Sequence, residues 1–330
     1  MFGINILGTG SYSPSLNVTN DDMSKIVETS DEWISTRTGI KSRFLSDGES
    51  AWQMGAKASE RAIEAAGINP EEIGLVIGST VTGDFYTPSL ACLVQNAVGA
   101  VNAAAFDLNA ACSGFAYSVD TAKRFLQTDD TLKYVLIVSS EVLSRFVDYT
   151  DRSTCVLFGD GAGAVVVERS EKLYTSFLGS DGNGAKFLYA KRFFPQHPFR
   201  TGETVDYGPD FTNETQFLFQ DGKEVYKFAT KALPTAAANA AEKIGLDPAE
   251  IDWFIPHQAN VRIIETAAKN LGVSMDRFIV NLNRHGNTSS ASIPTAFDEA
   301  VRDGRLKRGQ KICLVGFGAG LTYGAVICEY

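Results

Sequence analysis

Residues 61–73 read RAIEAAGINPEEI, and residues 240–251 read AAEKIGLDPAEI. Gly67 and Gly245 are separated by 178 positions, and so are the prolines three positions after each glycine. In both copies a helical pattern ends at the glycine, the proline prevents the helix from continuing, and a short apolar run follows. A unit that recurs at one long interval predicts a chain built from two similar halves.

The ends of the two halves are also similar. Residues 158–168 read FGDGAGAVVVE, and residues 317–320 read FGAG before AVICE at 325–329. In each half, helical patterns alternate with short apolar strands, which predicts an α/β protein with central mixed sheets. The apparent boundary divides the chain into residues 1–170 and 171–330.

Residues 181–221 interrupt the second half with an irregular segment that is rich in aromatic residues. Its aromatic side chains are Phe187, Tyr189, Phe193, Phe194, Phe199, Tyr207, Phe211, Phe217 and Phe219. A disordered linker would contain few aromatic residues, so we expect an ordered excursion that packs on apolar surface and lines a pocket.

Composition excludes several classes of function. The 330 residues are 44% hydrophobic, which is enough for a sizeable core, and carry a net charge of −9 with a pI near 5.0. This charge disfavours nucleic acid and anionic membrane as partners. No apolar run approaches the roughly 18 residues that span a bilayer, and the first residues lack a basic stretch that leads into an apolar one. We therefore expect a cytoplasmic protein without membrane or nucleic-acid partners.

The cysteines and histidines argue against disulfides and metals. Five cysteines are an odd number without a CxxC pair, and the three histidines form no HExxH motif, so we expect neither a disulfide framework nor a metal site. Four of the cysteines lie in apolar or helical stretches and are interpreted as small buried hydrophobic residues. These are Cys92, Cys155, Cys313 and Cys328.

Cys112 is different, because it follows an expected strand at 103–108 and starts a helical pattern in the stretch NAACSGF at 109–115. Small neighbours would let a substrate reach the sulfur, and a helix N-terminus would lower the thiol pKa from about 8.5. A buried cysteine in a close-packed turn is an equal alternative from local context.

Two further stretches are candidates for chemistry. His257 comes directly after an apolar strand, where α/β proteins hold reactive groups. His285 and Asn287 lie in a run of small polar residues at 283–292, which indicates either a loop rich in capping residues or a close approach to a ligand.

Two glycine-rich stretches, at 159–163 and 316–320, match neither dinucleotide nor Walker patterns and are interpreted as tight turns. The free N–H groups of such a turn would form an oxyanion hole if Cys112 were close by.

Together these motifs resemble those of one family, the β-ketoacyl-acyl-carrier-protein synthases III of the thiolase superfamily. The stretches that carry the resemblance span nearly the whole chain: DEWISTRTGI at 31–40, NAACSGF at 109–115, DR at 151–152, FGDGAGA at 158–164, HQANVR at 257–262, HGNTS at 285–289 and GFGAG at 316–320. The resemblance implies a five-layered αβαβα fold from two pseudo-equivalent halves, and a homodimer. The N-terminal half would carry the nucleophilic cysteine, and the C-terminal half the catalytic histidine and asparagine.

The resemblance also implies a reaction, in which an acyl-CoA primer acylates the cysteine. Malonyl-acyl carrier protein then loses CO2, and its carbanion attacks the thioester to give 3-oxoacyl-acyl carrier protein. Cys112, His257 and Asn287 would form the catalytic triad, without any permanently bound cofactor. The backbone N–H groups of Cys112 and Ala319 would hold the oxyanion, and Phe317 would keep the site dry.

Family counterparts also assign the binding surfaces. Trp33 and Arg152 would sandwich the CoA adenine, and Arg37 and Arg262 would meet its phosphates. Alternatively, Trp33 is a core aromatic residue and Arg37 a solvated helix charge.

A basic helix face is a candidate docking site for the acidic carrier protein. Lys223, Lys227 and Lys231 recur every four residues and so share one face of a helix, which with Arg262 and Lys269 would form the docking patch, unless this is an ordinary solvated face.

The chain departs from the family pattern in the acyl pocket. Thr87 stands where many members have an aromatic residue that shapes the pocket across the dimer interface, and this change would admit a primer bulkier than acetyl. Lys223 stands where some members have asparagine, and the excursion at 181–221 is longer than usual. One alternative is a related enzyme of secondary metabolism. Another is a non-catalytic partner subunit, although the presence of all three triad residues argues against it.

Overall fold

Two mixed β-sheets form the centre of the computed structural model, which describes residues 2–192, 198–199, 207–212 and 215–330. The first sheet has the order β1-β7-β6-β4-β5, in which β4 runs parallel to β5 and β6. The second has the order β11-β12-β13-β8, in which only β11 and β12 are parallel. The strands are β1 (Gly3–Tyr12), β4 (Ile73–Ser79), β5 (Ala104–Leu108), β6 (Tyr134–Glu141), β7 (Gly161–Ser170), β8 (Tyr174–Ser180), β11 (Trp253–Pro256), β12 (Lys311–Gly318) and β13 (Thr322–Glu329).

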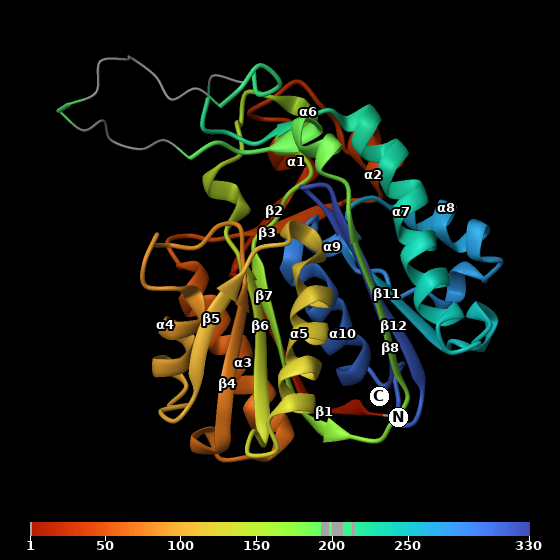
Figure 1. Ribbon diagram of the computed structural model, residues 1–330. Helices are drawn as coiled ribbons and strands as arrows, with labels where there is room; N and C mark the ends of the chain where they lie inside the picture. The colour runs from red at the N-terminus through yellow and green to blue at the C-terminus, as the bar shows by residue number, and fades with distance from the viewer. Residues whose placement is uncertain (1, 193–197, 200–206, 213–214) are drawn as a thin grey trace.

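Helices complete five layers, as Figure 1 shows. The outer face of the first sheet is covered by α3 (Ala51–Ala66) and α4 (Leu90–Ala97). Two helices lie between the sheets, α5 (Gly114–Thr128) and α10 (Ser292–Arg302), and the second sheet is covered by α7 (Gly222–Glu242) and α8 (Val261–Leu271). The predicted αβαβα arrangement is confirmed.

The core follows from alternation along buried strands. In β4, Leu75 and Ile77 join the central cluster with α5 and α10, whereas Val76 points to the outer cluster under α3. A strand that is covered on both faces must be apolar on both, which is why it appears in the sequence as a continuous apolar run.

Both copies of the repeated unit have the predicted local structure. Gly67 ends α3 with φ 65°, and Gly245 follows α7 with φ 66°. In each copy a 3-10 turn comes next, Pro70–Glu72 or Pro248–Glu250, and a capping box closes it. The chain then passes from the outer helical layer into a sheet. The repeat therefore leads into β4 of the first sheet and, in the same way, into β11 of the second.

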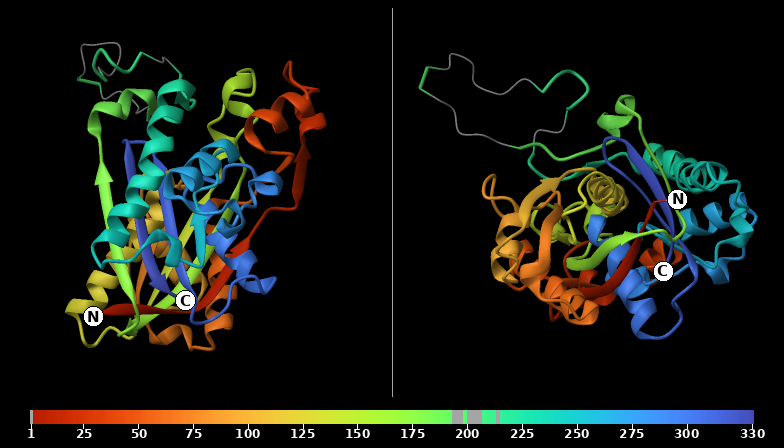
Figure 2. Two further views of the ribbon diagram at one scale, coloured as in Figure 1. Left: turned by 90° about the vertical axis from the view of Figure 1, so that its right-hand side faces the viewer. Right: turned by 60° about the horizontal axis from the view of Figure 1, so that its bottom comes forward.

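Most of the remaining elements gather above the ends of the sheets (Figure 2), but the turn at Met275–Arg277 lies beside the start of β11, where Arg277 donates to Ile251 O. The remaining elements are β2 (Leu16–Thr19), β3 (Ser42–Leu45), α1 (Asn20–Met23), α2 (Asp31–Thr38), α6 (Arg152–Cys155), α9 (Leu282–His285), β9 (Leu188–Tyr189), β10 (Phe219–Gln220) and short 3-10 turns at Ala111–Ser113, Leu143–Arg145, Gly182–Phe187, Met275–Arg277 and Ser289–Ala291.

The excursion is ordered in its described part. The ring of Tyr189 lies 5.0 Å from that of Phe211 and 5.1 Å from that of Phe219, and β9 pairs with β10. Phe193 and Phe194 lie outside the described residues.

Two predictions are wrong. Cys92 is exposed, because it lies on the outer surface of α4, whereas Cys155, Cys313 and Cys328 are buried as predicted. The glycine-rich stretches are not simply tight turns, since Gly161 and Gly163 belong to β7, and Gly316 and Gly318 belong to β12.

The division at residues 170 and 171 stays a prediction; it falls between β7 and β8. Within the described part of the chain, no helix has the length and apolar character needed to cross a membrane.

Candidate active site

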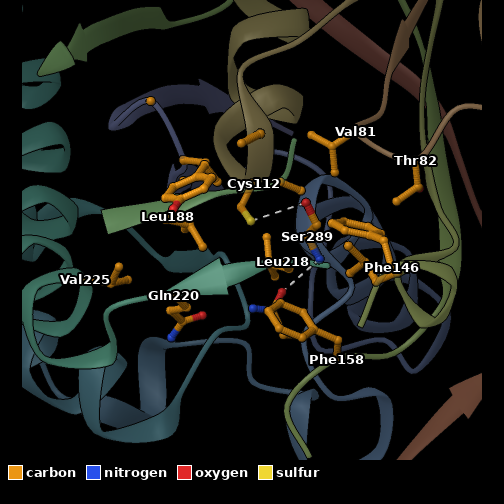
Figure 3. A pocket seen from close by; sticks show the side chains of 18 of the residues that line it. Val81, Thr82, Cys112, Phe146, Phe158, Leu188, Leu218, Gln220, Val225 and Ser289 are labelled. Atoms are coloured by element: carbon orange, nitrogen blue, oxygen red, sulfur yellow. Dashed lines mark hydrogen bonds between the residues drawn. The ribbon is translucent and has the colours of Figure 1, made fainter. Parts of the chain in front are cut away.

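Cys112 stands at the inner end of β5, where the chain turns into α5. A 3-10 turn, Ala111–Ser113, separates the strand from the helix, and Ala111 takes a positive φ of 46°. The side chain of Cys112 lines a cavity of about 840 Å³ (Figure 3), and its Sγ donates a hydrogen bond to Ser289 Oγ at 3.3 Å. The predicted strand-to-helix turn is confirmed, with an additional turn between the two elements.

The resting thiol is not acidic. Burial raises the pKa of Cys112 to about 12, and the carboxylate of Glu141 adds to this rise, whereas the Ser289 hydrogen bond opposes it. The expectation of a lowered pKa is therefore wrong, because burial of the thiol disfavours its charged form.

His257 follows the last residue of β11 and is fully buried. Its backbone N–H donates to Val315 O at 2.8 Å, which continues the pairing with β12, and its Nδ1 lies 2.7 Å from Ser292 Oγ. Burial lowers the pKa of His257 to about 3, against a hydrogen bond with the backbone of Ser289 that raises it. The imidazole is therefore neutral at physiological pH.

The backbone N–H and C=O of Asn287 both form hydrogen bonds with the segment 157–159, which precedes β7. Its N–H donates to Leu157 O at 2.9 Å, and its carbonyl accepts from Gly159 N at 3.0 Å. Its side-chain Oδ1 accepts from Ser289 N at 2.9 Å. Asn287 lines the cavity together with Cys112 and His257. Because Ser289 N–H already occupies its oxygen, the NH2 group is the part of the side chain that suits a ligand there.

A buried carboxylate anchors two loops of this cavity. Glu141, at the end of β6, accepts hydrogen bonds from Ser290 Oγ at 2.6 Å and from Thr82 Oγ1 at 2.6 Å, and burial raises its pKa. It also accepts from the backbone of Val81. The loop after β4 and the turn that carries Ser289 are thus tied to one residue.

The end of β12 packs directly on the nucleophile. A Cβ added to Gly318 would lie 2.5 Å from Cys112 N, so only glycine permits this approach. Phe317 is buried with its ring 5.3 Å from that of His257, and Ala319 follows along the cavity wall. The glycine-rich stretch and Cys112 are neighbours, which was the condition for an oxyanion hole.

Comparison with known proteins agrees with this arrangement. The family model of 3-oxoacyl-[acyl-carrier-protein] synthase III matches residues 106–182, and the model of its C-terminal part matches residues 241–330. The chain is 49% identical to the β-ketoacyl-[acyl-carrier-protein] synthase III of Clostridium acetobutylicum, over 100% of this chain and 99% of the relative. The chain belongs to the 3-oxoacyl-[acyl-carrier-protein] synthase III family.

Other relatives support this assignment. The synthase III of Caldanaerobacter subterraneus is 46% identical over 98% of this chain and 97% of the relative. The crystal structure of the enzyme from Aquifex aeolicus superposes with a TM-score of 0.90 at 41% identity and covers 99% of this chain and 100% of that one. As a member of the synthase III family, the chain is a condensing acyltransferase of fatty-acid biosynthesis.

The four residues that the synthase III motifs suggest for CoA binding lie together. The guanidinium carbons of Arg37 and Arg152 lie 4.7 and 4.8 Å from the Trp33 ring centroid. Arg262, on α8, donates to Thr36 O at 2.6 Å and so adjoins the same helix α2. Trp33 is only partly buried, on the outside of the core, as a stacking platform for a ligand would be.

The predicted docking residues occupy neighbouring helices. Lys223 and Lys227 are exposed on α7, and Lys269 and Arg262 are exposed on α8, which packs against α7. Lys227 forms an exposed ion pair with Glu224 at 3.5 Å.

Thr87, by contrast, is exposed and does not line the cavity of its own chain within the described residues.

Sequence reasoning missed Ser289, Ser292 and Glu141. The only signal for the two serines was the run of small polar residues at 283–292, and nothing local identified Glu141. From the same run, His285 turns away from the cavity, with Nε2 2.6 Å from Glu299 Oε1. Among the described residues, no cluster of histidine, cysteine and acidic side chains is arranged to hold a metal.

Proposed function

We propose that this synthase III condenses an acyl-CoA primer with malonyl-acyl carrier protein, and that Cys112 carries the primer as a thioester. The observation that carries the proposal is the convergence of Cys112, His257 and Asn287 on one cavity from three separate segments of the chain. In the first step, the sulfur attacks the primer thioester and CoA leaves with the thiol proton.

His257 and Asn287 generate the nucleophile of the second step. Loss of CO2 places negative charge on the malonyl thioester oxygen, which an imidazole N–H and an amide N–H stabilise as hydrogen-bond donors. The low pKa of His257 supports this role, because the ring donates without carrying a charge. The occupied Oδ1 of Asn287 supports it as well, because only the NH2 group is left for the substrate.

The carbanion then attacks the acyl group on Cys112, and the new oxyanion accepts hydrogen bonds from the backbone N–H groups of Cys112 and Ala319. The close packing of Gly318 on Cys112 supports this pairing. Phe317 supplies an apolar wall that disfavours the malonyl carboxylate relative to CO2.

The acyl-CoA primer binds through four side chains. The adenine stacks between Trp33 and Arg152 and takes the place of the cation–π contact between these two side chains. Arg37 and Arg262 pair with its phosphates. No cofactor is held permanently in this scheme; acyl-CoA is a substrate.

The carrier protein docks on the exposed cations of α7 and α8. Lys223, Lys227, Arg262 and Lys269 present exposed positive charge on an otherwise acidic protein.

A second copy of the chain completes the acyl pocket. Strand β5 forms one edge of its sheet, and the apolar surface beside it includes exposed Val101 and Phe125. Another copy that pairs along this edge would cover this surface and bring its own Thr87 toward the acyl chain. The protein would act in the cytoplasm, where its five free cysteines remain reduced.

The two halves divide the work in this scheme. Residues 1–170 supply the nucleophile, and residues 171–330 supply His257, Asn287 and the excursion at 181–221, whose Leu188 and Leu218 line the cavity.

The test is a half-reaction assay. His257→Ala and Asn287→Ala should still accept the acyl group from acyl-CoA, yet release CO2 from malonyl-carrier at least 100-fold more slowly than the wild type. Cys112→Ala should not accept the acyl group. Normal condensation by either of the first two variants would contradict the assignment.

A further inference from the structure

Ser289 contacts both the nucleophile and Asn287. Its Oγ lies 3.3 Å from Cys112 Sγ, along the dashed line between these two residues in Figure 3. Its N–H donates to Asn287 Oδ1 at 2.9 Å. Its φ is 49°, in the left-handed region that residues other than glycine rarely adopt. Such a conformation persists only where the surrounding structure holds it, and it often marks an active site.

The surroundings hold Ser289 firmly. The next residue, Ser290, donates to the buried Glu141 at 2.6 Å and to Ser79 O at 3.1 Å. Ser289 itself is only 2% exposed, and the turn is closed by the bond from Ala291 N to Thr288 O at 3.1 Å. These contacts therefore hold the hydroxyl at the sulfur.

A hydroxyl suits a sulfur that changes its protonation state. In the resting protein, the thiol donates and Ser289 Oγ accepts. A thiolate has no proton to donate, but the hydroxyl can rotate and donate to it. The other titratable groups around the sulfur are Glu141, whose charge opposes the thiolate, and His257, which is neutral. Because neither group supplies positive charge, a hydrogen-bond donor at the sulfur would be an important source of stabilisation for the thiolate.

We propose that Ser289 is a further catalytic residue, whose hydroxyl donates a hydrogen bond to Cys112 whenever the sulfur is a thiolate. The inference rests on the proposed function and assigns it one more group. In acylation, the bond from sulfur to the acyl carbon forms, the bond from that carbon to the CoA sulfur breaks, and the thiol proton ends on CoA.

In condensation, the carbanion forms the new C–C bond, and the thioester bond to Cys112 breaks. The sulfur again leaves as a thiolate, which takes a proton from solvent. Ser289 keeps its own proton in both steps and stabilises the anion each time.

Alkylation of Cys112 by iodoacetamide between pH 7 and 10 tests this role without any acyl substrate. Ser289→Ala should raise the thiol pKa by about one unit, because hydrogen bonds to charged groups are worth that much. A less acidic thiol is intrinsically more nucleophilic, so the alkylation rate at a fixed pH should fall only about threefold. Acyl-enzyme formation should slow in parallel.

Two further variants make the result decisive. Ser118→Ala removes a buried hydroxyl on α5 that has no partner among the described residues, so it should alkylate at the wild-type rate. Ser289→Gly also lacks the hydroxyl but relieves the positive φ, so it should alkylate as slowly as Ser289→Ala.

A wild-type rate in Ser289→Ala would overturn the proposal, and so would recovery of the rate in Ser289→Gly, which would assign the effect to backbone strain. Alkylation requires neither acyl-CoA nor carrier protein. The role of Ser289 can therefore be tested even if the condensation assay fails.

Discussion

Gly318→Ala tests how closely the end of β12 supports the nucleophile. The added Cβ would lie 2.5 Å from Cys112 N, 3.0 Å from Ala111 Cβ and 3.2 Å from Cys112 Cα. Ordinary contacts begin near 3.4 Å, so strand and nucleophile must separate by about 0.9 Å. A displacement of about 1 Å in a catalytic group costs on the order of 100-fold in rate, and overpacking costs about 1–3 kcal/mol of stability.

Neighbouring glycines provide a graded series for this experiment. In Gly316→Ala, the new Cβ would lie 3.2 Å from Cys112 O, so a small adjustment suffices and the loss of rate should be several-fold. In Gly182→Ala, the Cβ would meet nothing within 4 Å, so the rate should be unchanged. The assays are the condensation rate with saturating substrates and the unfolding free energy in urea. A rate for Gly318→Ala within twofold of the wild type, in a folded protein, would refute the reasoning.

Four other predictions concern the substrates and the donor pair. Trp33→Ala should raise the KM for acyl-CoA about tenfold at unchanged kcat, since aromatic stacking of a base is worth about 1–3 kcal/mol; an unchanged KM would contradict the adenine site. Lys227→Glu should raise the KM for malonyl-carrier several-fold, less so at high salt, whereas Lys307→Glu, at the opposite end of the sheet, should have no effect. Thr87→Phe should reduce turnover of octanoyl-CoA at least tenfold relative to acetyl-CoA; equal losses would contradict a role in the acyl pocket. Because the pKa of His257 lies near 3, its neutral form is lost only as the pH falls through that value, so CO2 release by acylated enzyme should show no step near pH 6.5.

The repeat was sufficient to predict two similar α/β halves because it combines three local signals, whereas the five layers were implied by the family resemblance. A glycine with positive φ, a proline-led 3-10 turn and a doubly buried strand each depend on neighbouring residues, and they occur twice at the same spacing. His257 was a candidate because it follows directly on an apolar strand. For Cys112, local context left two equal alternatives, and only the motifs elsewhere in the chain favoured the nucleophile.

Other features depend on contacts distant in the sequence. The partners of Ser289 and Ser292 are Cys112 and His257, each contributed by a different segment, and no local pattern encodes such a pairing. From local sequence, the helix N-terminus was expected to lower the pKa of Cys112. Burial of the thiol by segments distant in the sequence raises this pKa instead. Cys92 was assigned to the core from its apolar neighbours, although it lies on the exposed side of α4.

The most direct test of the account is mass spectrometry of the protein after incubation with acyl-CoA alone. We predict one added acyl group per chain, located on the peptide that contains Cys112, released by malonyl-acyl carrier protein and absent from Cys112→Ser. An acyl group on another residue, or one that persists in Cys112→Ser, would contradict the claim that this cysteine carries the primer.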